Sequence, residues 1–308
     1  MTGTTIRQRV EDYLAMRRTL GFTLITEGRL LLDFADRLDQ DGQDTVTVTA
    51  ALAWATASQA SANQQARRLG IVRVFARHLH ALDPACQIPA PGLLPARAHR
   101  PTPFIYSEAD IAALVHAADT ITAPLPSATV KALISLIAST GLRIGEALGL
   151  DRTDVETDAA MLTVTGKGGK TRLVPIHPTT AAMLAEYARH RDRLCRLVRA
   201  DSFFLTTGGR RPLQRGVQDT FARLVTHADI AAPAGRRRPR IHDLRHSFAV
   251  STLTDWQREG VDIAAQLPVL STYLGHCGPE ATYWYLQATG ELLALAADRL
   301  EPAQQERP

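Results

Sequence analysis

In the first 88 positions, hydrophobic residues recur every three or four positions, the spacing that places them on one face of an α-helix. The pattern occurs in four segments, which begin near Ile6, Glu27, Thr49 and Asn63. Gly21 and Gly42 follow the first two segments, and glycine commonly ends a helix. Residues 1–88 are therefore predicted to form a small bundle of four helices.

Prolines interrupt this pattern. Six of them fall between Pro84 and Pro103, and no hydrophobic periodicity long enough for a helix or a strand runs through the stretch. Proline-rich segments of this kind are typical of connections between domains. We therefore expect a linker over residues 89–103.

Helical signals resume after the prolines. Ser107 and Asp110 have the spacing of a capping box, which predicts that a helix starts there. A further helix is predicted from about Ala128 to Ser139 with Gly141 after it, and a short helix follows Arg143.

Two β-prone segments, residues 161–165 and 171–176, flank the sequence Gly166-Lys167-Gly168-Gly169, which is typical of a hairpin turn. Helical patterns then return up to residue 290. Residues 104–290 are therefore predicted to form a second domain, and the fold is expected to be mainly α with a small antiparallel β-sheet. The tail, residues 291–308, begins with an amphipathic helical pattern.

Composition supports two globular domains. The chain has 308 residues, of which 45% are hydrophobic and 21% charged, and these values are unlike those of a disordered, fibrous or membrane-embedded protein. No apolar run approaches the roughly 18 residues of a transmembrane helix, so a cytoplasmic protein is expected, with no membrane partner. The odd number and wide separation of Cys86, Cys195 and Cys277 argue against a disulfide framework.

Charge is distributed unevenly along the chain. The net charge is only +4, but residues 193–240 contain eleven arginines and three acidic residues, an excess that favours a polyanionic partner. The alternative is that these side chains only keep an exposed face solvated. The candidate DNA-binding residues lie on the fourth helix, after the hairpin turn and before His242, and are Arg67, Arg68, Arg73, Arg77, Lys170, Arg172, Arg236, Arg237, Arg238 and Arg240.

The sequence motifs of two other kinds of site do not match this chain. Gly169-Lys170-Thr171 resembles the end of a phosphate-binding loop, but Val164 occupies the position of that motif's first glycine. His242 and His246 are spaced as in zinc proteases, yet the glutamate of that motif is absent. We therefore expect neither a metal site nor a cofactor.

One constellation in the second domain remains, and it combines basic residues with a tyrosine. Arg143 precedes Ile144-Gly145-Glu146, and Lys167 occupies the hairpin turn. Further along the chain come the pair His242-x-x-Arg245, the triplet Leu274-Gly275-His276, and Tyr285, nine residues after His276.

In this order and context the sequence resembles the tyrosine recombinases, the phage integrase and XerC/XerD-like family. The resemblance covers the whole chain in architecture and residues 139–287 in motifs. It implies an N-terminal helical core-binding (SAM-like) domain, a linker and a tyrosine-recombinase catalytic domain. It also implies a site-specific recombinase that acts on double-stranded DNA as a homo-tetramer, alone or with sister recombinases, and whose tail docks on the next protomer or on its own domain.

Cleavage of a phosphodiester by direct attack requires a nucleophile, neutralisation of phosphate charge and a proton for the leaving oxygen. Arg143 and Arg245 present planar, permanently charged donors that can clamp a phosphate. The resemblance assigns the other roles. Tyr285 would form a 3′-phosphotyrosyl intermediate, and His242 would assist the transfer of its phenol proton. Lys167 would protonate the leaving oxygen, and His276 would hydrogen-bond the phosphate.

Alternatives stay open at this point. Lys170 competes with Lys167, and Tyr283 competes with Tyr285. Glu146 is expected to orient Arg143 or to support the fold rather than to contact DNA, and His246 is expected to pack or to support the site. A topoisomerase of type IB and a catalytically silent DNA-binding regulator are the competing functions.

Overall fold

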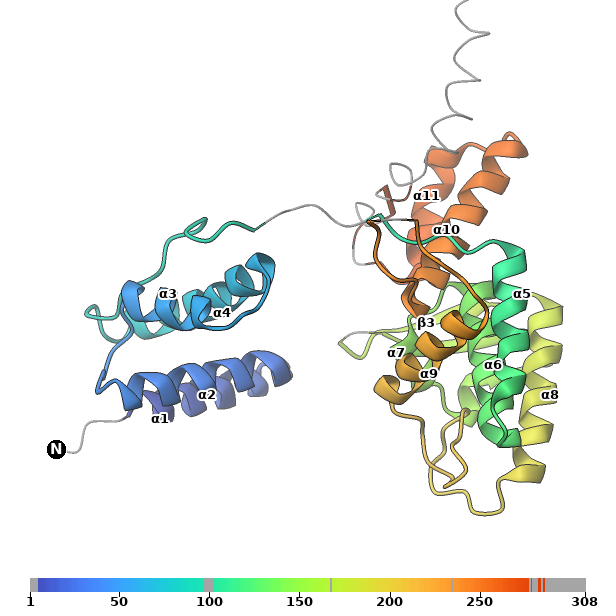
Figure 1. The fold of residues 1–308 in the computed structure, drawn as a ribbon, viewed down its shortest axis with the longest axis horizontal. Coiled ribbons are helices and arrows are strands. Elements are labelled where there is room, and N and C mark those ends of the chain that lie inside the picture. Colours follow the sequence, from blue (N-terminus) through green and yellow to red (C-terminus); the bar gives the residue numbers. More distant parts are fainter. Residues whose placement is uncertain are drawn as a thin grey trace, which may run out of the picture. The chain divides into compact units, whose positions relative to one another are not determined.

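The computed structural model describes residues 5–96, 102–166, 168–233 and 235–276, together with Gly278, Thr282, Tyr283 and Tyr285. The chain divides into two compact units, residues 1–100 and residues 101–308 (Figure 1). Among the helices described, none is long and apolar enough to cross a membrane.

The first unit is the predicted bundle of four helices. They are α1 (Ile6–Thr19), α2 (Ile25–Gln40), α3 (Val48–Ala57) and α4 (Ala62–His80). Phe34 of α2 packs against Trp54 of α3 with ring centroids 5.2 Å apart, and Tyr13 of α1 packs against Phe75 of α4 at 5.3 Å. Thr47, two residues before the expected Thr49, caps α3.

The proline-rich stretch stays in contact with the first unit beyond residue 89. The guanidinium group of Arg73 donates hydrogen bonds to the carbonyl oxygens of Pro89 (2.7 Å) and Ala90 (2.8 Å). Cys86 is buried in the core of the unit and Leu94 packs against it. The start of the expected linker is therefore held on α4, because one arginine side chain can bind two successive carbonyls.

The second unit is mainly helical with one small sheet, as predicted. Its elements are α5 (Glu108–Ala117), η1 (Ala118–Thr120), α6 (Pro124–Thr140), α7 (Ile144–Gly149), η2 (Arg152–Asp154), β1 (Val155–Glu156), β2 (Met161–Thr165), β3 (Thr171–Pro175), α8 (Pro178–Leu194), α9 (Gln214–His227), α10 (Ile241–Arg258) and α11 (Ile263–Leu274). The hydrophobic helix α6 packs against α5, α8 and α10 and forms the centre of the unit (Figure 1).

The three strands form an antiparallel sheet in the order β1-β2-β3. β2 pairs with β3 from Met161 opposite Pro175 to Thr165 opposite Thr171, which confirms the predicted hairpin. Gly168 and Gly169 in the turn have φ angles of 81° and 74°, a left-handed conformation that favours glycine. Lys167 lies outside the described residues.

Helices α10 and α11 form a separate small core. It consists of Ala249, Val250, Leu253, Leu267, Leu270, Leu274 and Tyr285. The tyrosine expected to be chemically active is therefore also a packed residue, with 2% of its surface exposed. The expected tail, residues 291–308, and Cys277 lie outside the described residues, whereas Cys86 and Cys195 are buried free thiols.

Gly141 ends α6 with a φ of 64°, and a Cβ atom there would lie 2.6 Å from Phe248 Cδ1 of α10. We expect Gly141→Ala to lower the free energy of unfolding by at least about 1–2 kcal/mol, the cost of left-handed backbone for a residue with a side chain. Denaturant unfolding of the purified protein measures this loss. The control is Gly149→Ala in α7, where a Cβ meets nothing within 4 Å and φ is not positive. Equal stability of the two variants would contradict the argument.

Candidate active site

Arg143 lies in the turn between α6 and α7. Its Nη1 donates to Glu146 Oε1 (2.8 Å) and to the carbonyl oxygens of Leu274 (3.4 Å) and Gly275 (3.1 Å). Its backbone N–H donates to the other carboxylate oxygen of Glu146 at 3.0 Å. Glu146 therefore caps α7 and orients the arginine at the same time.

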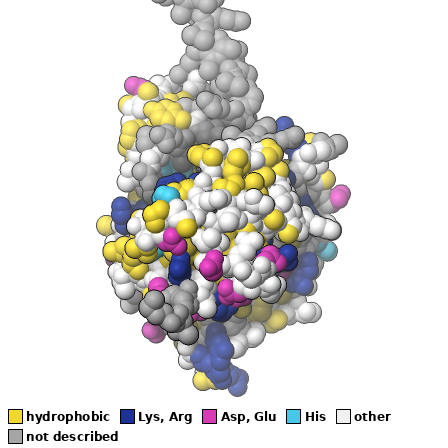
Figure 2. Space-filling view, turned by 90° about the vertical axis from the view of Figure 1, so that its left-hand side faces the viewer, with side chains coloured by type: hydrophobic (Ala, Val, Ile, Leu, Met, Phe, Trp, Pro, Cys, Tyr) yellow, Lys and Arg dark blue, Asp and Glu magenta, His cyan; other side chains and the backbone are white. Residues whose placement is uncertain are grey.

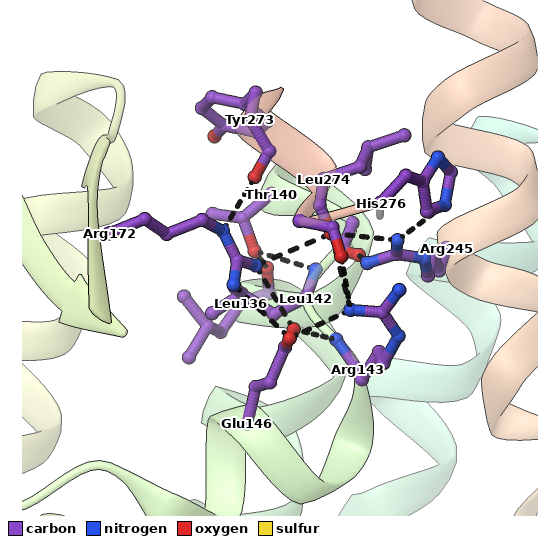
Figure 3. Close-up of polar contacts among 12 residues, drawn as sticks. Leu136, Thr140, Leu142, Arg143, Glu146, Arg172, Arg245, Tyr273, Leu274 and His276 are labelled. Carbon is purple, nitrogen blue, oxygen red and sulfur yellow. Dashed lines mark hydrogen bonds and ion pairs between the residues drawn. The ribbon is translucent and has the colours of Figure 1, made fainter. Parts of the chain in front are cut away.

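Glu146 is a buried carboxylate shared by two arginines, with 7% of the residue exposed (Figure 3). Arg172 of β3 binds it with two parallel hydrogen bonds, of 3.2 and 3.1 Å. Burial tends to raise the pKa of Glu146, but the hydrogen bonds and charges of Arg172 and Arg143 outweigh it and hold the pKa below its ordinary value. The carboxylate is therefore ionised at neutral pH.

Arg172 also binds the end of α11. Its Nε donates to the carbonyl oxygen of Tyr273 (2.9 Å), and its Nη2 lies 3.4 Å from that of Leu274. A Cβ at Gly275 would lie 2.6 Å from Arg172 Nη1, and Gly275 has a φ of 68°, so glycine is required here on both counts. Arg172 was expected to contact DNA; instead its guanidinium group is bound within the protein.

Arg245 of α10 is almost completely buried, with 1% exposed. It donates to the carbonyl oxygens of Gly141 (2.7 Å) and Leu274 (2.8 Å), and its Nη2 lies 2.8 Å from His276 Nε2. Burial, followed by repulsion from Arg143, lowers its pKa to about 10. The group still carries its charge at neutral pH, and it shares the Leu274 carbonyl with Arg143 (Figure 3).

The contacts of His276 define its tautomer. Because a guanidinium group only donates, His276 Nε2 must accept from Arg245. In the neutral ring the proton then resides on Nδ1, which lies 2.8 Å from Thr282 Oγ1 and donates to it. His276 is thus held between α10 and the segment that carries Tyr285.

The two candidate tyrosines have different environments. Tyr285 is buried, its ring is stacked with that of His276 at 6.2 Å between centroids, and its hydroxyl lies 3.2 Å from His246 Nδ1. Burial lowers the pKa of Arg245, and the Tyr285 hydroxyl opposes this shift through its charge when ionised and through a side-chain hydrogen bond. Tyr283 is 49% exposed.

The two histidines of α10 contact each other. The rings of His242 and His246 meet edge to face, with centroids 4.7 Å apart and planes at 84°. His242 has an exposed surface, but desolvation of its ring by the surrounding groups, followed by the charge of Arg245, lowers its pKa below its ordinary 6.5, so the neutral ring predominates at pH 7. His246 was expected only to pack or to support the site. The structure places its Nδ1 within hydrogen-bond distance of the Tyr285 hydroxyl.

Five of the six residues of the predicted constellation are described, and the structure brings these five together. They come from the turn before α7, from α10, from the end of α11 and from the segment after it. Lys167 is the sixth and lies outside the described residues. Within the described part of the chain, no group of three or more His, Cys, Asp or Glu residues could hold a metal ion.

The candidate DNA contacts of the first unit differ in availability. Arg68 lies over the Trp54 ring at 3.9 Å and donates to the Trp54 carbonyl oxygen at 3.3 Å, so it is part of the fold. Arg73 is likewise engaged by the carbonyls of Pro89 and Ala90. Arg67 is exposed and pairs with Glu27, and Arg77 is exposed. The sequence could not separate these cases, since an arginine on a helix can turn inward or outward.

In the second unit, Lys170, Arg236 and Arg237 are exposed. Arg238 is exposed and donates to Thr226, whereas Arg240 binds Asp243 at the start of α10. On the face of the molecule shown in Figure 2, basic side chains are interspersed with acidic and hydrophobic ones, and a group of basic side chains gathers at the lower end of the view.

Comparison with known proteins adds to this geometry. Residues 105–291 match the model of the phage integrase family. The chain is 41% identical to the putative integrase/recombinase y4rB of Sinorhizobium fredii, over 98% of this chain and 99% of the relative. It is 32% identical to the tyrosine recombinase XerD of Caulobacter vibrioides, over 88% of each chain.

Among solved structures, the chain is similar to the XerH site-specific recombinase bound to its palindromic difH substrate after cleavage. The TM-score is 0.65 at 19% identity, covering 96% of this chain and 85% of that one. This similarity concerns the fold.

We expect Glu146→Gln to lower the free energy of unfolding by about 1–3 kcal/mol at pH 7, because the hydrogen bonds to the two arginines lose their ionic partner. A carboxyl whose pKa is lowered by folding stabilises the protein above its unfolded pKa, and that contribution is lost as the pH falls through the folded pKa. The difference between the two proteins should therefore shrink below about pH 4.5.

Thermal or denaturant unfolding as a function of pH measures both effects. The matched control is Asp219→Asn, since Asp219 forms an exposed pair with Arg215 four residues away on α9. A difference for Glu146→Gln that persists unchanged to low pH would show that the ionised carboxylate is not the stabilising species.

Proposed function

The chain belongs to the phage integrase family and is a site-specific DNA recombinase, and we propose that it cleaves and rejoins DNA strands through a covalent bond between Tyr285 and a 3′ phosphate. The observation that carries this proposal is the convergence of Arg143 and Arg245 on one carbonyl oxygen, that of Leu274. Arg245 also binds His276, whose ring stacks with that of Tyr285. A phosphate bound there lies within reach of a nucleophile.

The environment of the two arginines favours the binding of an anion. Burial and, after it, the repulsion between these like charges lower the pKa of Arg245, and a phosphate between the two arginines would relieve that repulsion. Their present acceptors include neutral carbonyl oxygens, which bind a guanidinium group less strongly than a phosphate oxygen does. Such preorganised donors stabilise the charge that develops on phosphorus in the transition state.

In the chemical step, the phenol oxygen of Tyr285 attacks phosphorus, the bond from phosphorus to the 5′ oxygen breaks, and the phenol proton is lost. The departing 5′ oxygen takes up a proton, and we assign its donation to Lys167 by resemblance to the family. The neutral His242 assists the loss of the phenol proton, and His276, oriented by Arg245 and Thr282, hydrogen-bonds the phosphate.

The reaction exchanges one phosphodiester linkage for another. The phosphotyrosyl bond retains the energy of the broken strand, so a 5′ hydroxyl from a second strand can reverse the step and complete an exchange. Cleavage and rejoining therefore need no energy from nucleotide hydrolysis.

We assign double-stranded DNA as the substrate and the cytoplasm as the compartment. Exchange between two duplexes breaks four strands, and each copy of the chain supplies one Tyr285, so the assembly on DNA is a homo-tetramer. Residues 1–88 clamp the DNA through exposed side chains such as Arg67 and Arg77, and Lys170 and Arg236–Arg238 extend the basic surface of residues 104–290. By resemblance to the family, we assign the tail, residues 291–308, to docking on the next protomer.

We expect the wild-type protein to form a covalent adduct with nicked duplexes taken from the DNA that flanks its own gene, because the nick prevents religation. Tyr285→Phe should abolish the adduct, whereas Tyr283→Phe, the matched control two residues away, should retain it. Denaturing electrophoresis of labelled DNA detects the adduct.

An adduct formed by Tyr285→Phe but not by Tyr283→Phe would contradict the assignment of the nucleophile. A wild-type protein that binds the duplex without any adduct would make it a DNA-binding regulator. Adducts on every duplex, with relaxation of supercoiled plasmids and no requirement for a site, would make it a topoisomerase.

A further inference from the structure

We propose that Arg172 is a positioning residue for the reaction: it fixes Glu146 and the end of α11, and through them it aims Arg143 at the scissile phosphate. The inference rests on the proposed function, in which Arg143 binds that phosphate. The observation that carries it is that Arg172 and Arg143 share two acceptors, the carboxylate of Glu146 and the carbonyl oxygen of Leu274.

Arg172 is itself occupied within the protein. Its Nε donates to the carbonyl oxygen of Tyr273 at 2.9 Å. Its Nη1 and Nη2 donate to the two oxygens of Glu146 at 3.2 and 3.1 Å, and Nη2 also lies 3.4 Å from the carbonyl oxygen of Leu274. The side chain is 15% exposed, against 40% for that of Arg143. Arg172 therefore acts through its neighbours rather than on the phosphate.

Arg143 keeps donors for the phosphate. Within the described residues, all hydrogen bonds of its side chain use Nη1, with Glu146, Leu274 and Gly275 as the acceptors. Its Nη2 and Nε can therefore serve an anion. Their direction depends on where Nη1 is held, and two of the three groups that hold Nη1 are also bound by Arg172.

The guanidinium group of Arg172 lies where three segments meet. A Cβ at Gly275 would be 2.6 Å from its Nη1, and a Cβ at Gly166 would be 3.7 Å from the same nitrogen. Gly275 follows the last residue of α11 and precedes His276, Gly166 follows the last residue of β2, and Glu146 comes from α7. One side chain thus joins the sheet, α7 and the end of α11.

The other contacts of Glu146 are local. Arg143, which binds it through Nη1 and through its backbone N–H, is only three positions away, so these bonds tie the pair to the first turn of α7. Arg172 is 26 positions from Glu146 and comes from β3. It is therefore the link that fixes the pair relative to the sheet and, through the carbonyl oxygen of Tyr273, relative to α11.

Loss of Arg172 should therefore impair one part of the reaction, the stabilisation of charge on the phosphate. Preorganised donors stabilise that charge only when they already lie in the correct place. The attack by Tyr285 and the protonation of the leaving oxygen do not involve Arg172. A deficit caused by its removal should consequently depend on the charge of the scissile phosphate.

The test compares two substrates in single-turnover adduct formation. The first is the nicked duplex used above. In the second, a methyl group replaces one non-bridging oxygen of the scissile phosphate, whose position is mapped with the first. The methylphosphonate is neutral, so less negative charge develops for the arginines to stabilise. The variants are Arg172→Ala and Arg172→Lys, since lysine keeps the charge but cannot donate two parallel hydrogen bonds to Glu146.

On the ordinary duplex, both variants are expected to be slower than wild type at saturating DNA by about 10²-fold, the loss that a small displacement of an active-site group can cause. Their affinity for the duplex should be unchanged. On the methylphosphonate, their rates should approach that of wild type. In an Arg143→Ala background, removal of Arg172 should add little to the deficit on the ordinary duplex, because the residue through which it acts is gone.

The matched control is Arg152→Ala. Arg152 is an exposed arginine of η2 that pairs with Asp192 at 2.9 Å, and this variant should react at the wild-type rate on both substrates. Thermal unfolding identifies a variant of Arg172 that fails to fold, in which case the other variant supplies the result.

Three outcomes would overturn the inference while Tyr285→Phe remains inactive. Wild-type rates for the Arg172 variants would show that Arg143 is aimed without Arg172. Equal deficits on the two substrates, or deficits that multiply with that of Arg143→Ala, would show a role in folding alone. Weaker DNA binding with an unchanged saturating rate would make Arg172 a DNA contact. An adduct formed by Tyr285→Phe would instead overturn the proposed function itself.

Discussion

The carbonyl oxygen of Leu274, at the end of α11, is the point on which the site depends. Three arginines from three different elements donate to it: Arg245 of α10 at 2.8 Å, and Arg143 and Arg172 at 3.4 Å each. The last carbonyls of a helix lack partners within the helix and carry its partial negative charge. This end of α11 therefore holds three cations together that would otherwise repel one another, and it does so next to His276 and Tyr285.

Such an arrangement serves the fold and the chemistry at once. Glu146 neutralises part of the positive charge from below, and the helix end does so from above (Figure 3). What remains is an excess of hydrogen-bond donors whose natural partner is an anion with several oxygens, such as a phosphodiester. Burying charged guanidinium groups costs free energy, and these hydrogen bonds offset that cost. The same hydrogen bonds fix the orientation of the arginines, so the site reorganises little when the transition state forms.

The sequence was sufficient to predict the four helices of the first unit and the β2–β3 hairpin, and it singled out the five described residues that meet at the site, because these follow from hydrophobic spacing, turn chemistry and motif order. It did not predict which arginines turn inward. Arg68, Arg73 and Arg172 are long side chains that find aromatic or carbonyl partners only in the folded chain. Nor did spacing alone reveal the contact between His246 and Tyr285, since the two residues lie 39 positions apart and their distance depends on how the segment after α11 returns to α10.

The most direct test of this account is to identify the amino acid that becomes joined to DNA. The trapped protein–DNA adduct is digested with a protease and a nuclease, and the remaining peptide with its nucleotide is sequenced by mass spectrometry. The account predicts a nucleotide linked through its 3′ phosphate to the oxygen of Tyr285. Attachment to Tyr283 or to any other side chain, or a linkage through a 5′ phosphate, would contradict it.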